Sequence, residues 1–138
     1  MSFDLANYKV KARFAIKRFW TGGKTGARKN IAGGLDGFKD LVVDIVCANG
    51  LTRANVLSPD QPITLPGHFS PTQPWDLVVV NEGRLIAAIK FECLIGSSFT
   101  ETANRLCYEA LGRAMDFQAI SRKAIFGVCK KPFVGYLV

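Results

Sequence analysis

The stretch Asp76-Leu-Val-Val-Val80, followed by Asn81-Glu-Gly83 and Arg84-Leu-Ile-Ala-Ala-Ile-Lys-Phe-Glu92, is the most informative part of this 138-residue chain. Two runs rich in β-branched residues flank a short loop that ends in glycine, and this pattern predicts a β-hairpin. With a three-residue loop, Val80 faces Arg84, and the numbers of facing residues sum to 164. The hairpin therefore has a predicted register.

Side chains alternate along a strand, so this register sorts the hairpin into two faces. The polar face carries Asp76, Lys90 and Glu92, together with Ala88. The apolar face is expected to pack in the core and consists of Leu85, Ala87, Ile89 and Phe91.

Two carboxylates and a lysine on one face suit phosphodiester hydrolysis. Carboxylate oxygens are ligands for Mg²⁺, which keeps waters for the attack on phosphorus. A lysine nearby stabilises the charge that develops in the transition state. The candidate catalytic residues are thus Asp76, Lys90 and Glu92, with Asp76 and Glu92 as metal ligands. The alternative is a solvated charged pair at the end of an edge strand.

Helical spacing of apolar residues predicts three helices, over residues 3–20, 36–48 and 101–119, the second of them capped by Asp36. Residues 21–34 hold five glycines and are expected to form a flexible basic loop. Five of the six prolines fall between residues 58 and 74, which predicts an extended connector with one short strand at 63–65. Residues 132–138 are expected to form a final strand.

The chain has 18 Lys and Arg against 11 Asp and Glu, a net charge of +7 that suits a polyanion such as nucleic acid, although a merely basic protein would look the same. The four cysteines show neither zinc-ribbon nor disulfide-framework spacing and are expected to be reduced, with Cys47, Cys93 and Cys107 buried. With no apolar run long enough to span a bilayer and no secretory signal, we expect a cytoplasmic protein with no membrane association.

Several segments, in their order and spacing, resemble the XhoI-like type II restriction endonucleases over nearly the whole chain. These segments are Leu35-Asp-Gly-Phe38, Asn49-Gly-Leu51, Ile63-Thr-Leu-Pro-Gly67, Pro74-Trp-Asp-Leu-Val-Val-Val80, Leu85-Ile-Ala-Ala-Ile89, Gly96-Ser-Ser-Phe99, Glu109-Ala-Leu-Gly112 and Pro132-Phe-Val-Gly-Tyr-Leu137. The combination is far more specific than any one of them.

The resemblance implies an α/β fold of the PD-(D/E)XK (restriction-endonuclease-like) type, a central mixed β-sheet flanked by helices. It also implies Mg²⁺-dependent cleavage of palindromic double-stranded DNA by a homodimer, within a restriction–modification system that includes a partner DNA methyltransferase. Contacts to DNA are expected from Lys24, Arg28 and Lys29 in the basic loop and from Asn104 and Arg105.

The chain departs from the family pattern at two points. Asp76 matches the first metal-binding acid, but Lys90 stands where the second acid is expected and Glu92 where the catalytic lysine is expected. Family members also continue beyond the strand that ends near Val138, so residues 1–138 are interpreted as a single domain that is incomplete at its C-terminus. The alternatives are a catalytically inactive DNA-binding remnant of the family and a basic structural protein unrelated to nucleases.

Overall fold

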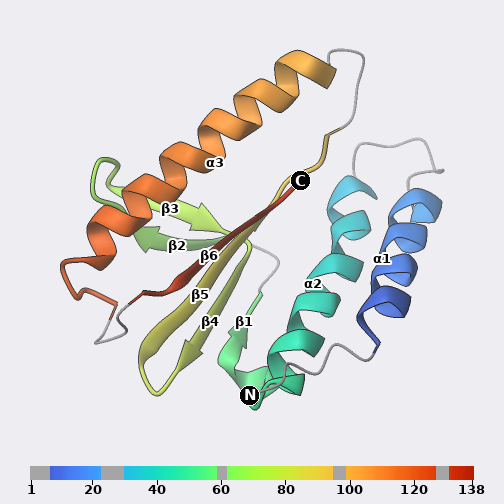
Figure 1. The fold of residues 1–138 in the computed structure, drawn as a ribbon, viewed down its shortest axis with the longest axis horizontal. Coiled ribbons are helices and arrows are strands. Elements are labelled where there is room, and N and C mark those ends of the chain that lie inside the picture. Colours follow the sequence, from blue (N-terminus) through green and yellow to red (C-terminus); the bar gives the residue numbers. More distant parts are fainter. Residues whose placement is uncertain (1–6, 23–29, 59–61, 95–98, 127–130) are drawn as a thin grey trace. The chain divides into compact units, whose positions relative to one another are not determined.

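The computed structural model describes residues 7–22, 30–58, 62–94, 99–126 and 131–138, which form two compact units, residues 1–55 and 56–138 (Figure 1). The first unit is helical, and the second combines strands with one long helix. The expected α/β class, with a mixed sheet and helices, is confirmed. That residues 1–138 constitute a single domain stays a prediction.

The first unit is a pair of packed helices, α1 (Tyr8–Gly22) and α2 (Asn30–Ala48). The sequence-based start of the second helix at Asp36 is wrong, because α2 begins at Asn30 and includes glycines that were assigned to the loop. Gly34 lets α1 pack closely on α2, because a Cβ there would lie 3.0 Å from Cδ2 of Phe19. Close helix packing therefore explains glycines that look like loop residues in the sequence.

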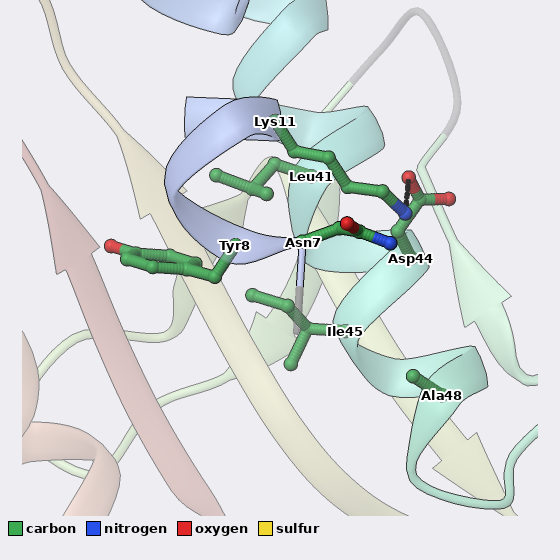
Figure 2. Close-up of a pocket in the computed structure, with 7 residues that line it drawn as sticks. All are labelled: Asn7, Tyr8, Lys11, Leu41, Asp44, Ile45 and Ala48. Atoms are coloured by element: carbon green, nitrogen blue, oxygen red, sulfur yellow. Dashed lines mark hydrogen bonds and ion pairs between the residues drawn. The ribbon is translucent and has the colours of Figure 1, made fainter. Parts of the chain in front are cut away.

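A small groove runs between α1 and α2 (Figure 2). It has a volume of about 70 Å³, and the Lys11 ammonium and the Asp44 carboxylate, 2.8 Å apart, form an ion pair at its edge. That volume lies well below the roughly 300–1,000 Å³ of pockets that bind small molecules. The groove is therefore too small to be a nucleotide site.

The second unit is built on a four-stranded sheet in the order β1-β4-β5-β6. Its strands are β1 (Val56–Leu57), β4 (Leu77–Asn81), β5 (Arg84–Phe91) and β6 (Phe133–Leu137). The β5–β6 pair is parallel and the other two pairs are antiparallel, so the sheet is mixed. The final strand expected over 132–138 is confirmed, whereas β1 was not predicted.

A separate two-stranded ribbon precedes β4 and consists of β2 (Ile63–Pro66) and β3 (Thr72–Trp75). The first strand was expected at 63–65, but β3 was not, because Pro74 argued against a regular strand. A two-stranded ribbon leaves many backbone groups unpaired on its outer edges, so it tolerates a proline that a central strand would not. Asp76 follows β3 directly and separates it from β4.

The turn of the β4–β5 hairpin is shorter than predicted. Asn81 faces Arg84 across Glu82 and Gly83, whose φ angles are 51° and 72°. Two central residues with positive φ are typical of the type I′ turn, which matches the twist of the flanking strands. The predicted three-residue loop is therefore wrong.

A bulge follows the turn and changes the register again. Val80 pairs with Leu85 and Val79 pairs with Ala87, so Ile86 is the extra residue of β5. Beyond the bulge, facing residues such as Val78 and Ala88 have numbers that sum to 166 rather than the predicted 164. Both sums are even, so the predicted polar face survives although the predicted register does not.

One helix, α3 (Phe99–Ser121), covers the face of the sheet that carries Ala88. Its Phe117 ring meets the fully buried Trp75 edge to face at 5.5 Å. Leu85 lies in the same cluster as Ala88, contrary to the prediction, because the bulge at Ile86 turns it to that face.

The cysteines differ in part from expectation. The three in the described residues are free, as predicted, but Cys47 and Cys107 are exposed rather than buried, and Cys93 is half-buried. Cys129 lies outside the described residues. Within those residues, none of the helices has the length and apolar character required to cross a membrane.

Candidate functional site

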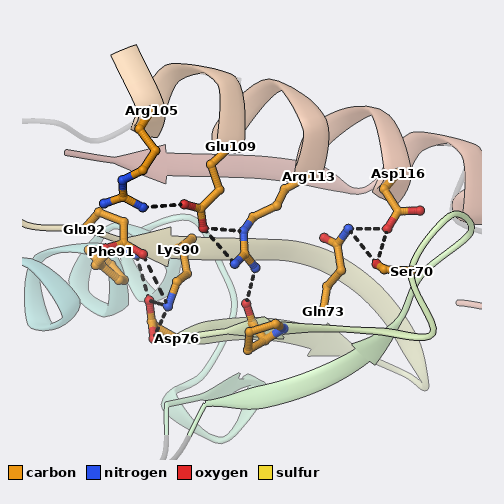
Figure 3. A network of polar contacts seen from close by, with 11 residues as sticks. Ser70, Gln73, Asp76, Lys90, Phe91, Glu92, Arg105, Glu109, Arg113 and Asp116 are labelled. Carbon is orange, nitrogen blue, oxygen red and sulfur yellow. Dashed lines mark hydrogen bonds and ion pairs between the residues drawn. The ribbon is translucent and has the colours of Figure 1, made fainter. Parts of the chain in front are cut away.

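Asp76, Lys90 and Glu92 meet at the end of β5, as the strand faces predict (Figure 3). The Lys90 ammonium lies 3.0 Å from Oδ2 of Asp76, donates a hydrogen bond to its Oδ1 at 3.1 Å and lies 3.8 Å from Oε1 of Glu92. The side chains of Asp76 and Lys90 are 17% and 13% exposed, and that of Glu92 is 30% exposed. A lysine ammonium thus stands between two partly exposed carboxylates.

Backbone groups fix the orientation of Asp76. The Phe91 N–H donates to Oδ2 of Asp76 at 2.9 Å, and the Asp76 N–H donates to the Ile89 carbonyl oxygen at 3.1 Å. Because hydrogen bonds to an ionised carboxylate are shorter and stronger than neutral ones, they hold the side chain in one geometry. Asp76 is therefore presented rigidly at the junction between β3 and β4.

A polar row on α3 runs beside this cluster (Figure 3). Glu109 accepts hydrogen bonds from Arg113 at 2.8 and 3.1 Å and from Arg105 at 3.3 Å. Arg113 also donates to the Pro74 carbonyl oxygen at 3.2 Å, two residues before Asp76. The i, i+4 spacing puts all three side chains on one helix face, and Arg113 links that face to the strand that positions Asp76.

Asp116 ends the row with a buried carboxylate that is 3% exposed. It accepts hydrogen bonds from the backbone N–H groups of His68 and Phe69, both at 2.6 Å, from Ser70 Oγ at 2.7 Å and from Gln73 Nε2. Burial alone would raise the pKa of this carboxyl, but the four donors outweigh it and lower the pKa to about 2. Asp116 therefore clamps the tip of the β2–β3 ribbon as an anion.

Two further side chains near the cluster are held in their neutral forms. Burial and the negative charges of Glu109 and Glu92 raise the pKa of Tyr136 to about 12. Burial, and then the charge of Glu92, also raises the pKa of the Cys93 thiol. Tyr136 thus keeps its proton at neutral pH, and Cys93 is a poor nucleophile there because the thiolate is the reactive form.

The other predicted site residues are placed less completely. Asn104 and Arg105 are exposed on α3, and Arg105 is paired with Glu109. The basic-loop residues lie outside the described residues: Lys24, Arg28 and Lys29. Sequence reasoning missed Arg113 and Asp116, although the four-residue spacing of Arg105, Glu109 and Arg113 was a signal for an ion-pair row.

Within the described parts of the chain, no group of three or more His, Cys, Asp or Glu side chains could hold a metal ion. The carboxylates of Asp76 and Glu92 form a pair on either side of Lys90.

Comparisons with known proteins agree with this architecture. Residues 18–138 match the family described as restriction endonuclease XhoI. The whole chain is 38% identical to the type II restriction enzyme AbrI of Azospirillum brasilense and 35% identical to the type II restriction enzyme XhoI of Xanthomonas vasicola, of which it covers 68% and 61%. Over 86% of the chain it is 33% identical to the type II restriction enzyme BstVI of Geobacillus stearothermophilus, of which it covers 55%.

No solved structure is significantly similar to the chain. The family match extends over the β4–β5 hairpin, α3 and β6, so it includes every element that builds the Asp76–Lys90–Glu92 cluster. The resemblance seen in the sequence is confirmed, and the chain belongs to the XhoI family of type II restriction endonucleases.

Proposed function

We propose that this chain acts on double-stranded DNA and hydrolyses a phosphodiester bond at the Asp76–Lys90–Glu92 cluster. The observation that carries the proposal is the convergence of these three side chains at the partly exposed end of β5. Membership of a restriction endonuclease family supports DNA as the substrate. The net charge of +7 supports it too, since a basic surface attracts the phosphate backbone.

The donor set fits Mg²⁺ in chemistry. Asp76 and Glu92 supply carboxylate oxygens, which Mg²⁺ prefers, and the ion completes its shell with waters and substrate phosphate oxygens. The two carboxylates already flank one cation, the Lys90 ammonium. Asp76 and Glu92 would therefore hold the ion once Lys90 moves aside. When bound, such an ion polarises a phosphate oxygen and lowers the pKa of its water.

The side chains of the protein have separate roles in this proposal. The Phe91 N–H keeps Asp76 oriented, and Arg113 holds the strand in front of it through the Pro74 carbonyl oxygen. Lys90, displaced from between the carboxylates, places its ammonium beside the phosphate and stabilises the added negative charge of the transition state. Exposed Asn104 and Arg105, with Lys24, Arg28 and Lys29, contact the DNA backbone.

A second candidate function is binding of DNA without cleavage. The position of Lys90 favours it, because its ammonium stands 3.0 Å from Asp76 and thereby takes the place of a metal ion. Family members are expected to have the acid and the lysine in the opposite order. In this candidate the chain keeps the fold and the basic surface of a nuclease but has exchanged the metal for an internal ion pair.

Cleavage of supercoiled plasmid separates the two candidates. The purified chain is incubated with plasmid in MgCl₂ or in EDTA, next to an Asp76→Asn variant that keeps the shape of the side chain. Hydrolysis that needs Mg²⁺ and falls by at least about a hundredfold in Asp76→Asn supports the nuclease. If both proteins are equally inert but still bind the plasmid, the nuclease proposal fails and the binding candidate stands.

The double substitution Lys90→Glu with Glu92→Lys tests the exchange itself. Both side chains lie on one face, two residues apart, or about 7 Å along the strand. Displacements of that size in a reacting group are costly for catalysis. If the exchange inactivates the site, the double variant gains Mg²⁺-dependent cleavage; if the variant stays inert, the order of the two residues is not what limits activity.

We also propose the assembly that a palindromic target requires. A homodimer presents two equivalent sites to the two strands, and a partner DNA methyltransferase protects the host's copies of the target. The proposed location is the cytoplasm, where such a system meets incoming DNA. Light scattering on the purified chain with and without duplex DNA measures the oligomer, and a monomer in both states would refute the dimer.

A further inference from the structure

Gly112 has no structural reason to be a glycine within the described part of the protein. It lies in the middle of α3, and a Cβ built there meets no described atom within 4 Å. Glycine inside a helix makes the helix less stable than alanine does. Gly34 and Gly37, by contrast, lie in contact with α1. Gly112 differs from these two helical glycines because the space beside it, where a side chain would lie, is open.

That space is a hollow between α3 and the β2–β3 ribbon, which we call the Gly112 hollow. It has a volume of about 590 Å³, within the range of small-molecule sites, and is lined by Phe69, Thr72, Gln73, Pro74 and Arg113 besides Gly112. Pro74 connects it to the cluster, because Asp76 follows two residues later, about 7 Å along an extended chain.

The charges around the hollow argue against an anionic ligand. Glu109 and Asp116 line it beside the single cation Arg113, whose guanidinium already bonds to Glu109 and to the Pro74 carbonyl oxygen. A phosphate in the hollow would therefore face two carboxylates and an arginine that already donates hydrogen bonds to other groups. A neutral ligand with polar edges meets no such penalty.

The neutral groups of the hollow suit a flat, polar-edged ring. Gln73 is 8% exposed, and within the described residues its buried Oε1 has no hydrogen-bond partner. Figure 3 shows this oxygen on the side of the amide away from Asp116, while Nε2 faces the carboxylate. The amide orientation is thus set by Asp116, and Oε1 is covered by the protein rather than open to the hollow. Ser70 and Thr72 add hydroxyl groups.

Phe69 supplies an aromatic ring on a rigid support at the rim. Its side chain is 76% exposed, yet its backbone N–H is fixed to Asp116 at 2.6 Å. The same loop packs tightly at Gly67, where a Cβ would overlap the Ser70 carbonyl oxygen and lie 2.7 Å from Oδ2 of Asp116. Nucleobases stack on such aromatic rings when they leave the base stack.

We propose that the Gly112 hollow accepts one unstacked nucleobase of the bound DNA, with Phe69 as its stacking partner. The absence of a side chain at position 112 gives the ring its space. This inference rests on the proposed action on DNA and adds a base-contacting subsite to it.

The probe is a labelled DNA duplex that carries one unpaired 2-aminopurine, compared with the fully paired duplex of the same sequence. An unpaired base costs least to unstack, so the comparison needs no knowledge of the recognised sequence. In fluorescence anisotropy we expect the wild-type chain to bind the unpaired-base duplex on the order of tenfold more tightly than the paired duplex.

Gly112→Leu places a side chain in the hollow, where its Cβ would meet no described atom within 4 Å, and leucine favours a helix over glycine. We expect this variant to keep its thermal stability and its affinity for the paired duplex and to lose the preference for the unpaired base. Phe69→Ala should lower the preference as well. Gln118→Leu, which adds the same side chain at an exposed position of α3 that does not line the hollow, is the matched control and should keep it.

A wild-type chain that binds both duplexes equally overturns the subsite. So does a Gly112→Leu variant that retains the preference in full. Failure of the wild-type chain to bind any duplex overturns the proposed function together with the subsite, and the result is therefore distinct from the first two. If Gly112→Leu lowers thermal stability, the test rests on the Phe69→Ala variant instead. The Phe69 ring is exposed and contributes little to the core, so a loss of preference for the unpaired base in that variant cannot be due to unfolding.

Discussion

At the scale of single residues, Lys90 determines what the site can bind. Its ammonium is 13% exposed and lies 3.0 Å from Asp76 and 3.8 Å from Glu92, so it neutralises one of two adjacent negative charges. Without that ammonium the two carboxylates would face each other at the end of β5. Like charges at short range are relieved by an added cation, so in the proposed metal site Lys90 and a divalent ion would compete for the same place.

Replacement of Lys90 by Met should therefore create a divalent-ion site. Without metal we expect Lys90→Met to lose roughly 1–3 kcal/mol of folding stability, because it leaves two partly buried carboxylates without their partner. Added Mn²⁺ should raise the melting temperature of Lys90→Met and leave that of the wild type nearly unchanged. Calorimetric titration with Mn²⁺ measures the same difference as an affinity.

The control is Lys90→Met combined with Asp76→Asn, which removes one of the two carboxylates. It should lose the response to Mn²⁺. A wild-type chain that binds Mn²⁺ as tightly as Lys90→Met would show that the ammonium does not compete with metal.

Asp116 gives a prediction on pH dependence. Its pKa is lowered from 3.8 to about 2 on folding, so the unfolded chain binds more protons between these values. The carboxylate therefore contributes stability that is complete above about pH 4 and is lost as the pH falls through about 2. The contribution at neutral pH is roughly 2 kcal/mol.

Comparison with Asp116→Asn isolates this contribution from those of the other acids. The variant should be less stable than the wild type by roughly 2 kcal/mol at pH 7, and the difference should shrink as the pH approaches 2. Urea unfolding at a series of pH values measures it. A difference that stays constant down to pH 2 would show that the clamp does not depend on the charge of Asp116.

At the scale of elements, the β4–β5 turn holds a residue in an unfavourable conformation. Glu82 has a φ of 51°, a region in which Asn and Gly are common and Glu is not. Glu82→Asn should raise the free energy of unfolding by about 0.5–1 kcal/mol, since Asn tolerates this conformation better. Chemical denaturation measures the change. A loss of stability would mean that Glu82 makes a compensating contact.

The glycines of α2 and α3 should respond differently to alanine. Gly112→Ala gains helix propensity without a new contact and should stabilise the protein by about 0.5–1 kcal/mol. A Cβ at Gly37 would lie 3.1 Å from the Ala15 Cα, so Gly37→Ala must push α1 and α2 apart and should gain less or destabilise. Thermal melts of the two variants make the comparison, and equal effects would contradict it.

The sequence predicts elements well where local patterns decide them and poorly where distant contacts do. The hairpin, α3 and β6 follow from alternation and helical spacing. The start of α2 was misplaced because its glycines serve contacts with Phe19 and Ala15, which no local pattern reveals. The strand β3 was missed because its pairing partner β2, not its own composition, makes it a strand.

The contacts of the site also fall into those that local sequence patterns predict and those that depend on distant residues. Strand parity brings Asp76, Lys90 and Glu92 together, and this was predictable from the sequence. The link from Arg113 to the Pro74 carbonyl oxygen joins residues 39 positions apart, and Asp116 reaches back 48 positions to His68. Such contacts depend on how α3 crosses the ribbon, which the residues themselves do not encode locally.

At the scale of the whole molecule, the net charge of +7 predicts that binding to DNA weakens as salt rises. The size of that effect depends on how many phosphates the protein contacts, and four of the proposed DNA contacts are Lys or Arg residues. With about four phosphate contacts, the affinity for duplex DNA should fall by on the order of a hundredfold between about 50 and 200 mM salt. Arg105→Ala should reduce the slope of log affinity against log salt by about 1. Arg84→Ala removes an exposed arginine at the hairpin turn that is not among the proposed DNA contacts, and it should leave the slope unchanged.

The bulge in β5 gives the hairpin one position at which its length can change without disturbing the site. Val80 pairs with Leu85 and Val79 pairs with Ala87, so Ile86 is the extra residue between two consecutive pairs. Paired residues share a face of the sheet, so deletion of Ile86 would close the bulge and leave Lys90 and Glu92 on the face of Asp76. Deletion of one residue between Ala87 and Lys90 would instead send both to the opposite face, so a gene for this hairpin tolerates the loss of one codon at the bulge but not closer to the site.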